Sequence, residues 1–175
     1  MEAMEYIENR TYDEIQVGDS ASLVRTLKPQ DIQLFAIMSG DVNPSHVDPE
    51  YARSSMFREV IAHGMWGGAL ISTVLGTQFP GPGTIYVDQT LHFSRPVGLG
   101  DTITVMVTAT RKFDHNHHIL FDCVCTNQDG QKVIGGTAEV LAPTEKIKRP
   151  RIELPEVTIV DREARYQHLL DRTRG

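Results

Sequence analysis

The chain has 175 residues, of which 40% are hydrophobic and 23% charged, and its formal net charge is −6. This length and composition predict one domain with a single hydrophobic core. The negative charge argues against a nucleic acid as partner, because proteins that bind nucleic acids present basic surfaces.

The sequence also argues against a membrane protein and a secreted one. No run approaches the roughly 18 apolar residues of a membrane span, and no apolar stretch follows the acidic residues 1–5, as it would in a secretory signal. Cys123 and Cys125 lie on one face of a predicted strand, where they are poorly placed to bond each other. We therefore expect buried, reduced cysteines and a cytoplasmic location.

The first half of the chain is predicted to hold one strand and three helices. Residues 20–27 form a short strand, and residues 30–38 a helix whose apolar side chains have helical spacing. Asp48 and Pro49 suit the N-cap and first position of a second short helix, so Asp48 is interpreted as a cap in preference to a metal ligand. Residues 64–79 carry no formal charge and begin with small residues, which predicts an apolar helix that a ligand or backbone can approach closely.

The second half of the chain has the pattern of an antiparallel sheet. Gly135 and Gly136, inside the last predicted strand, indicate a bulge or a close backbone approach. Runs of β-branched and aromatic residues separated by turn signals predict strands at residues 84–97, 101–113, 118–127 and 132–141.

Five strands and one apolar helix give an α+β layout. The sheet has to bury its apolar face, and the helix at residues 64–79 is the only candidate to cover it. We therefore predict an antiparallel five-stranded sheet wrapped around this central apolar helix. The unpaired edge strands of such a sheet favour dimerisation, because an exposed edge invites pairing.

Candidate chemistry lies in the loop between the first two helices. Ser39-Gly40-Asp41 and Asn43-Pro44 are turn formers that hold polar side chains outside regular structure. Asp41 and His46 are five residues apart, so a bent loop can bring both to one water, within the roughly 3 Å that proton transfer requires. Taken alone, such an aspartate is as often only a turn or helix cap, and a lone loop histidine is more often solvated or structural.

Two stretches of the sequence carry a family signature. From Ser39 to Pro49 the chain reads Ser-Gly-Asp-Val-Asn-Pro-Ser-His-Val-Asp-Pro, and from Ile61 to Met65 it reads Ile-Ala-His-Gly-Met. Together they resemble the signature of the MaoC-like (R)-specific enoyl-CoA hydratase and dehydratase family, whose members have the hot-dog fold. The resemblance extends over about residues 12–142.

The resemblance implies a role for each polar residue of the signature. Asn43 and His63 are candidate supporting residues, and for His63 a hydrogen bond that fixes the loop is favoured over a third catalytic role. No metal and no cofactor are expected, because CoA is part of the substrate. The family pattern assigns an acid–base pair, an oxyanion donor and a residue that orients the aspartate, which in this chain are Asp41 and His46, the Gly64 N–H, and Ser72.

The implied reaction is the reversible addition of water to a trans-2-enoyl-CoA, giving the (R)-3-hydroxyacyl-CoA. The first N–H groups of the central helix lack internal partners and lie at the positive end of its dipole, so they stabilise a thioester oxygen that gains negative charge. The sequence leaves open which of Asp41 and His46 is base and which is acid. The resemblance also implies a homodimer or higher homo-oligomer, with the acyl chain in a tunnel near the dimer interface.

Two alternative functions stay open from the sequence alone. One is a non-catalytic acyl-CoA-binding or docking module of a fused acyltransferase, and the other is a hot-dog thioesterase. The intact catalytic set argues against the module, because a binding module has no need of an acid–base pair. The motif from Asn43 to His46 argues against the thioesterase.

The C-terminal residues 143–175 are predicted to lie outside the hot-dog domain, which spans residues 1–142. The Pro-rich and charged stretch 143–155 predicts a linker, and residues 161–172 predict a short helix. The whole chain is similar to the N-terminal hydratase domain of proteins that fuse it to a phosphate acetyl/butyryltransferase. A fused or docked phosphate acyltransferase is therefore a candidate partner.

Two further patterns are weaker. The histidine-rich hairpin at residues 114–118 could bind a metal, but one turn offers few closed geometries, so structural or solvated histidines are favoured. The basic run 146–151 could meet CoA phosphates, and a charged linker is favoured.

Overall fold

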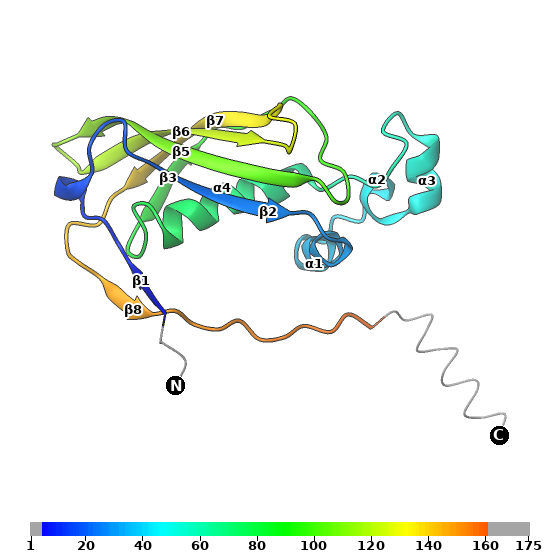
Figure 1. Ribbon diagram of the computed structural model, residues 1–175, viewed down its shortest axis with the longest axis horizontal. Helices are drawn as coiled ribbons and strands as arrows, with labels where there is room; N and C mark the ends of the chain where they lie inside the picture. The colour runs from blue at the N-terminus through cyan, green and yellow to red at the C-terminus, as the bar shows by residue number, and fades with distance from the viewer. Residues whose placement is uncertain (1–4, 161–175) are drawn as a thin grey trace, which may run out of the picture.

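The computed structural model describes residues 5 to 160, in which a curved antiparallel sheet covers one side of helix α4 (Gly64–Thr77) (Figure 1). The strand order is β2-β5-β6-β7-β3, and β4 also pairs with β7. The predicted α+β layout is therefore confirmed. The strands of this sheet are β2 (Ser20–Thr26), β3 (Ile85–Gln89), β4 (His92–Phe93), β5 (Thr102–Phe113), β6 (His118–Thr126) and β7 (Lys132–Leu141).

The prediction of one continuous strand over residues 84–97 is wrong. The chain forms β3 and β4 instead, both paired with β7, so the sheet has six strands where five were predicted. At the break, the Thr90 N–H donates to the Thr137 carbonyl at 2.8 Å and the two threonine hydroxyls lie 2.9 Å apart. A Cβ at Gly136 would overlap the Thr90 carbonyl oxygen, so this glycine permits the close backbone approach that was predicted.

The hydrophobic core lies between α4 and the sheet. Along β5, Ile103, Val105 and Val107 are buried and their neighbours are more exposed, as the alternation of the sequence predicts. Each fully buried side chain of this size contributes about 1.5–3 kcal/mol. Helix α4 and strand β6 supply further buried residues, namely Trp66, Leu70, Ile71, Val74, Leu75, Ile119, Phe121, Cys123 and Cys125.

Three short helices lie together at one end of the sheet (Figure 1). They are α1 (Pro29–Ser39), α2 (Pro44–Val47) and α3 (Pro49–Ser54). Asp48 caps α3 by accepting from the N–H groups of Glu50 and Tyr51, which confirms the predicted cap. None of the helices within residues 5–160 is long and apolar enough to cross a bilayer.

Residues directly after 142 pack against the N-terminal segment, so the predicted linker is partly wrong. Strand β8 (Lys148–Pro150) pairs with β1 (Tyr6–Glu8). The 3₁₀ helix η1 (Tyr12–Glu14) follows β1 along the chain. Asn9, which is buried, bonds the carbonyl of residue 145 and the N–H of residue 147 at 2.9 Å. Its partners lie more than 130 residues away, which no local pattern indicates. The predicted helix at residues 161–172 lies outside the described residues.

Candidate active site

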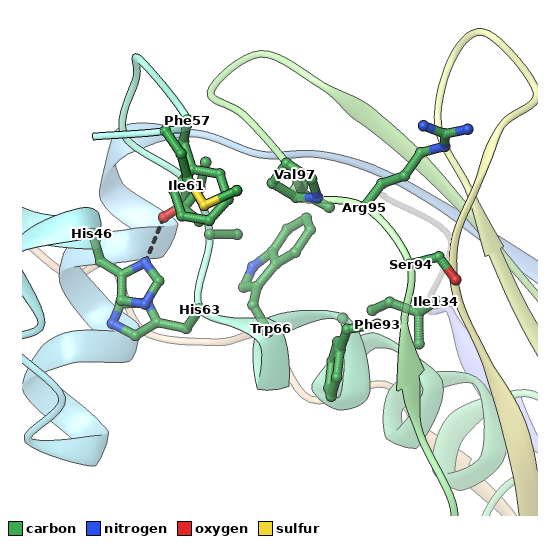
Figure 2. Close-up of a pocket in the computed structure, with 15 residues that line it drawn as sticks. His46, Phe57, Ile61, His63, Trp66, Phe93, Ser94, Arg95, Val97 and Ile134 are labelled. Atoms are coloured by element: carbon green, nitrogen blue, oxygen red, sulfur yellow. Dashed lines mark hydrogen bonds between the residues drawn. The ribbon is translucent and has the colours of Figure 1, made fainter. Parts of the chain in front are cut away.

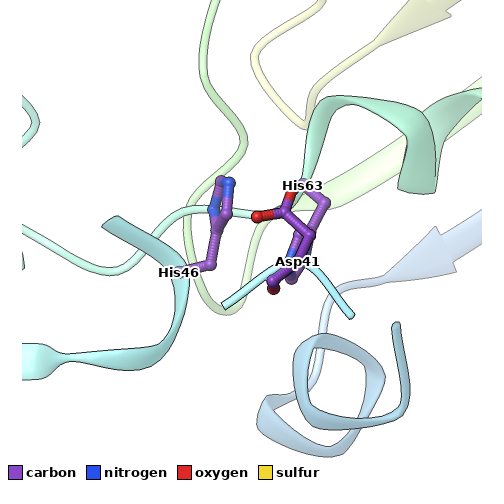
Figure 3. Close-up of side chains that lie close together, drawn as sticks. All are labelled: Asp41, His46 and His63. Atoms are coloured by element: carbon purple, nitrogen blue, oxygen red, sulfur yellow. The ribbon is translucent and has the colours of Figure 1, made fainter. Parts of the chain in front are cut away.

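The loop after α1 turns on local hydrogen bonds. Helix α1 ends at Gly40, whose φ of 77° is left-handed and suits glycine. The Ser39 hydroxyl then accepts from the Asp41 N–H at 3.2 Å, and Asp41 Oδ1 accepts from the Asn43 N–H at 3.1 Å. Asn43 in turn caps α2 by accepting from the Ser45 N–H at 3.1 Å. These turns place His46 on α2, directed back toward Asp41 (Figure 3).

His46 is held by a backbone carbonyl. Its Nδ1 lies 2.8 Å from the Ile61 oxygen, the bond drawn in Figure 2. Because a carbonyl oxygen can only accept, Nδ1 carries the proton of this hydrogen bond. In a neutral imidazole the lone pair is then on Nε2, which leaves Nε2 as the nitrogen that can accept a proton.

His63 lies beside both catalytic candidates and is only 3% exposed. Its Nε2 lies 3.0 Å from the Asp41 carbonyl oxygen, so it forms the loop-fixing bond that the sequence favoured. The ring stacks on Phe35 at 4.7 Å between centroids and lies 4.0 Å from the His46 ring. A carboxylate oxygen of Asp41 and one nitrogen of each histidine all lie within 4.8 Å of one another.

The two histidines of this cluster line a pocket of about 420 Å³ at the start of α4 (Figure 2), and Asp41 lies behind them, outside its lining. Gly64, the first helical residue, is exposed to it, and its N–H is one of the first-turn donors that a helix leaves unpaired. A Cβ on Gly64 would lie 3.1 Å from the Phe93 ring, so glycine keeps this entrance open. The walls are mostly apolar and include Met56, Phe57, Ile61, Ala62, Trp66, Phe93, Pro96, Val97 and Ile134, with Arg95 at the rim.

Known proteins are similar to this chain in sequence and in fold. Residues 14–123 match the family model described as MaoC like domain. The chain belongs to the MaoC-like dehydratase family. It is 46% identical over 132 residues to an (R)-specific enoyl-CoA hydratase of Rhodospirillum rubrum, which covers 75% of this chain and 91% of that protein. An (R)-specific enoyl-CoA hydratase of Aeromonas caviae is 35% identical over 129 residues, or 74% and 96% of the two chains.

Two solved structures agree with these relatives. The unliganded R-hydratase PhaJ1 from Pseudomonas aeruginosa superimposes with a TM-score of 0.86 at 44% identity, over 89% of this chain and 100% of that one. The (R)-hydratase of A. caviae gives a TM-score of 0.72 at 35% identity, over 74% and 98%. The predicted hot-dog fold of this MaoC-like chain is therefore confirmed.

Ser72 is the predicted site residue that this MaoC-like structure does not bring to the others. Eight residues of helix separate it from Gly64, which is about 12 Å along the axis. Ser72 is exposed and lines a second pocket of about 430 Å³, together with Phe35 and other residues. Among the hydrogen bonds of residues 5–160, none joins Ser72 to Asp41, whose Oδ1 accepts from Asn43 instead. Its proposed orienting role stays a prediction.

Two features of the MaoC-like site were missed from the sequence. The Ile61 carbonyl holds His46, and the Phe35 ring supports His63. Both residues lie within residues 12–142, over which the chain resembles the family, but main-chain acceptors and ring stacking leave no pattern in residue types. The histidine-rich hairpin instead makes a structural pair, His118 Nδ1 to Glu139 at 2.6 Å.

Proposed function

We propose that this chain adds water to a trans-2-enoyl-CoA to give the (R)-3-hydroxyacyl-CoA, and catalyses the reverse dehydration, with Asp41 and His46 as its acid–base machinery. The observation that carries the proposal is the grouping of a carboxylate and two imidazoles within 4.8 Å beside the first turn of α4. The (R)-specific hydratases that this chain resembles match it over at least nine-tenths of their own length, which supports the same reaction.

The water is activated by His46 in the proposed mechanism. Because Nδ1 donates to the Ile61 carbonyl, Nε2 is free to take a proton from a water as its oxygen bonds to C3 of the enoyl group. The Asp41 carboxylate orients that water and stabilises the imidazolium that forms. One backbone carbonyl holds each histidine ring, Ile61 for His46 and Asp41 for His63, so both rings are oriented before the substrate binds.

The thioester oxygen gains negative charge when the water oxygen attacks C3. The N–H groups at the start of α4, with Gly64 foremost, bind that oxygen at the positive end of the helix dipole. Losing one such donor typically costs about 3 kcal/mol. The imidazolium of His46 then returns its proton to C2 as the enolate collapses, so the histidine ends the cycle neutral and no net proton is consumed.

The test is the loss of enoyl-thioester ultraviolet absorbance when purified protein meets crotonyl-CoA, with free thiol assayed in the same tube. We expect hydration without thiol release, and a loss of about 10²–10⁴-fold in kcat for His46→Ala, the scale of general acid–base catalysis. Asp41→Asn should lose about 10²–10³-fold, the scale of losing one group that stabilises a developing charge. Asp48→Asn is the matched control, since asparagine is also a good N-cap and Asp48 binds only the backbone of α3. Activity should survive dialysis against EDTA, because no metal or cofactor enters the mechanism.

Three results would contradict the proposal in different ways. Thiol release would indicate a thioesterase. Binding of short, medium and branched enoyl-CoAs without turnover would indicate an acyl-CoA-binding module. Equal activity of Asp41→Asn and Asp48→Asn would remove Asp41 from the mechanism.

A second copy of the chain is the partner that we propose for the sheet edge. Ile85, Tyr86 and Val87 of edge strand β3 are 58%, 40% and 49% exposed, and an apolar edge of this kind needs a cover. Light scattering should give twice the mass of one chain, and a monomer at micromolar concentration would contradict this.

The buried free thiols of Cys123 and Cys125 support a reducing, cytoplasmic location. An acyltransferase partner stays a prediction.

A further inference from the structure

The imidazole of His63 is central to the site, although the proposed chemistry does not use it. Its ring is 3% exposed and lies between Phe35, at 4.7 Å, and His46, at 4.0 Å. Such a buried polar ring is costly unless its hydrogen bonds are satisfied. Within residues 5–160, Nδ1 of His63 is the one buried side-chain nitrogen or oxygen atom without a hydrogen-bond partner.

The hydrogen bonds define the tautomer of His63. Nε2 lies 3.0 Å from the Asp41 carbonyl oxygen, and only a donor satisfies a carbonyl, so the proton is on Nε2. Nδ1 then carries a lone pair and no hydrogen. A second proton there would have no acceptor, and the resulting charge would lie against the His46 ring. His63 is thus placed to donate one hydrogen bond, to the Asp41 carbonyl, and to lay its ring against those of Phe35 and His46.

The short segment 61–64 contacts or supplies each of the three functional groups of the proposed site. The Ile61 carbonyl holds His46, the His63 side chain holds the Asp41 backbone, and the Gly64 N–H begins the oxyanion site. Asp41 and His46 themselves come from a loop about 20 residues earlier that is largely exposed. The loop therefore depends on residues 61–64 for its position relative to the helix.

We propose that His63 is a positioning residue: its Nε2–H fixes the Asp41 backbone, and this hydrogen bond sets the distance between the Asp41 carboxylate and the base, His46. This inference rests on the proposed hydratase function. It differs from a direct proton-transfer role, because the only proton of His63 is engaged by a carbonyl that takes no part in the reaction. It also differs from plain packing, since it requires a donor at one particular atom.

Three substitutions separate these roles. The amide nitrogen of His63→Gln reaches about as far along the side chain as Nε2, so it keeps the donor to Asp41. His63→Asn places its amide near the position of Nδ1 and loses that donor, and His63→Phe keeps only the stacked ring. We expect kcat to fall about 10–100-fold in His63→Asn and His63→Phe with KM changed less than about threefold, because an ångström of misplacement costs up to about 10² in rate. His63→Gln should retain kcat within about fivefold.

Stability is measured on the same variants. His63 is the N-cap residue of α4 and makes no side-chain cap bond there, whereas asparagine is a favoured cap. His63→Asn should therefore melt no lower than His63→Gln. A large loss of kcat at unchanged melting temperature is the signature of positioning, and equal losses in Gln and Asn variants would overturn the proposal. Unchanged kcat in all three variants would overturn it as well.

A readout without catalysis keeps the inference separate from the hydratase assignment. Two-bond ¹H–¹⁵N correlation spectra of ¹⁵N-histidine-labelled protein distinguish the two neutral tautomers, and His63 is assigned by the signal missing in His63→Gln. We expect the Nε2–H form for His63. The Nδ1–H form or a doubly protonated ring at neutral pH would overturn the proposal even in an active hydratase, whereas the expected tautomer in a protein without hydratase activity would locate the failure in the proposed function.

Discussion

The close backbone approach at Gly136 leads to a testable prediction, and the neighbouring Gly135 serves as the control position. An alanine Cβ at Gly136 would overlap the carbonyl oxygen of Thr90 and lie 2.8 Å from its carbonyl carbon, both of which are backbone atoms. Thr90 cannot easily move away, because its N–H and hydroxyl are both bonded to Thr137. At Gly135, in the same strand, the new Cβ would meet only the end of the Lys132 side chain, which is flexible.

The expected magnitudes follow from this difference. Overpacking a site with fixed neighbours costs about 1–3 kcal/mol, and replacing glycine by alanine returns about 0.4–1 kcal/mol by restricting the unfolded chain. We therefore expect Gly136→Ala to lower the free energy of unfolding by about 1.3 kcal/mol, the difference between the centres of these two ranges, and Gly135→Ala to leave it unchanged or raise it by up to about 1 kcal/mol.

Urea unfolding followed by tryptophan fluorescence tests the pair, because the chain has one tryptophan and Trp66 is buried in the core. With a slope of about 2 kcal/mol per molar urea, the midpoint of Gly136→Ala should fall by about 0.6 M relative to the parent. Both variants are compared at one protein concentration. Midpoints that agree with each other would refute the reasoning, since they would mean that the Thr90 backbone yields at no cost.

Two further predictions use the ionisable groups. Burial raises the pKa of Cys123 to about 12 and of Cys125 to about 11. Neither thiol should therefore react with DTNB at pH 8 in the native protein, and both should react once urea unfolds the chain. Reaction of the native protein would contradict their burial. The bond from Lys146 lowers the pKa of Glu14 from 4.5 to about 2, so its stabilisation is present above pH 4.5 and is lost toward pH 2. The melting temperatures of the parent and of Glu14→Gln should differ at pH 6, and this difference should shrink below pH 4.5 and close only near pH 2. A constant difference would contradict the assignment.

The sequence predicted those parts of the fold that depend on neighbouring residues. The alternation around Val105 fixed which face of β5 is buried, and Asp48 before Pro49 indicated the start of α3 correctly. The division of residues 84–97 into two strands depends on the bonds between Thr90 and Thr137, which are 47 residues apart. No local pattern carries that information.

The candidate site was predictable to the same extent. Turn formers around Asp41 indicated that the loop would fold back on itself, and the structure does bring the carboxylate close to His46. The roles of the two rings depend on which ring nitrogen meets a carbonyl, and that is set by the path of residues 61–63. The distance of Ser72 from Gly64 could be predicted from the sequence, because helix geometry alone puts Ser72 about two turns beyond Gly64.

The positions of the site residues depend on one short segment, residues 61–64. Ile61 to Gly64 are consecutive, so the carbonyl, the imidazole and the N–H have to lie near one another, since successive Cα atoms are only about 3.8 Å apart. The helix that follows is anchored by Ile71 and Val74, which are fully buried. Core burial thus positions the proposed oxyanion donor, the Gly64 N–H, directly, and it positions Asp41 and His46 through the two hydrogen bonds to this segment. Substitutions that break those bonds should therefore reduce the rate far more than they reduce the stability.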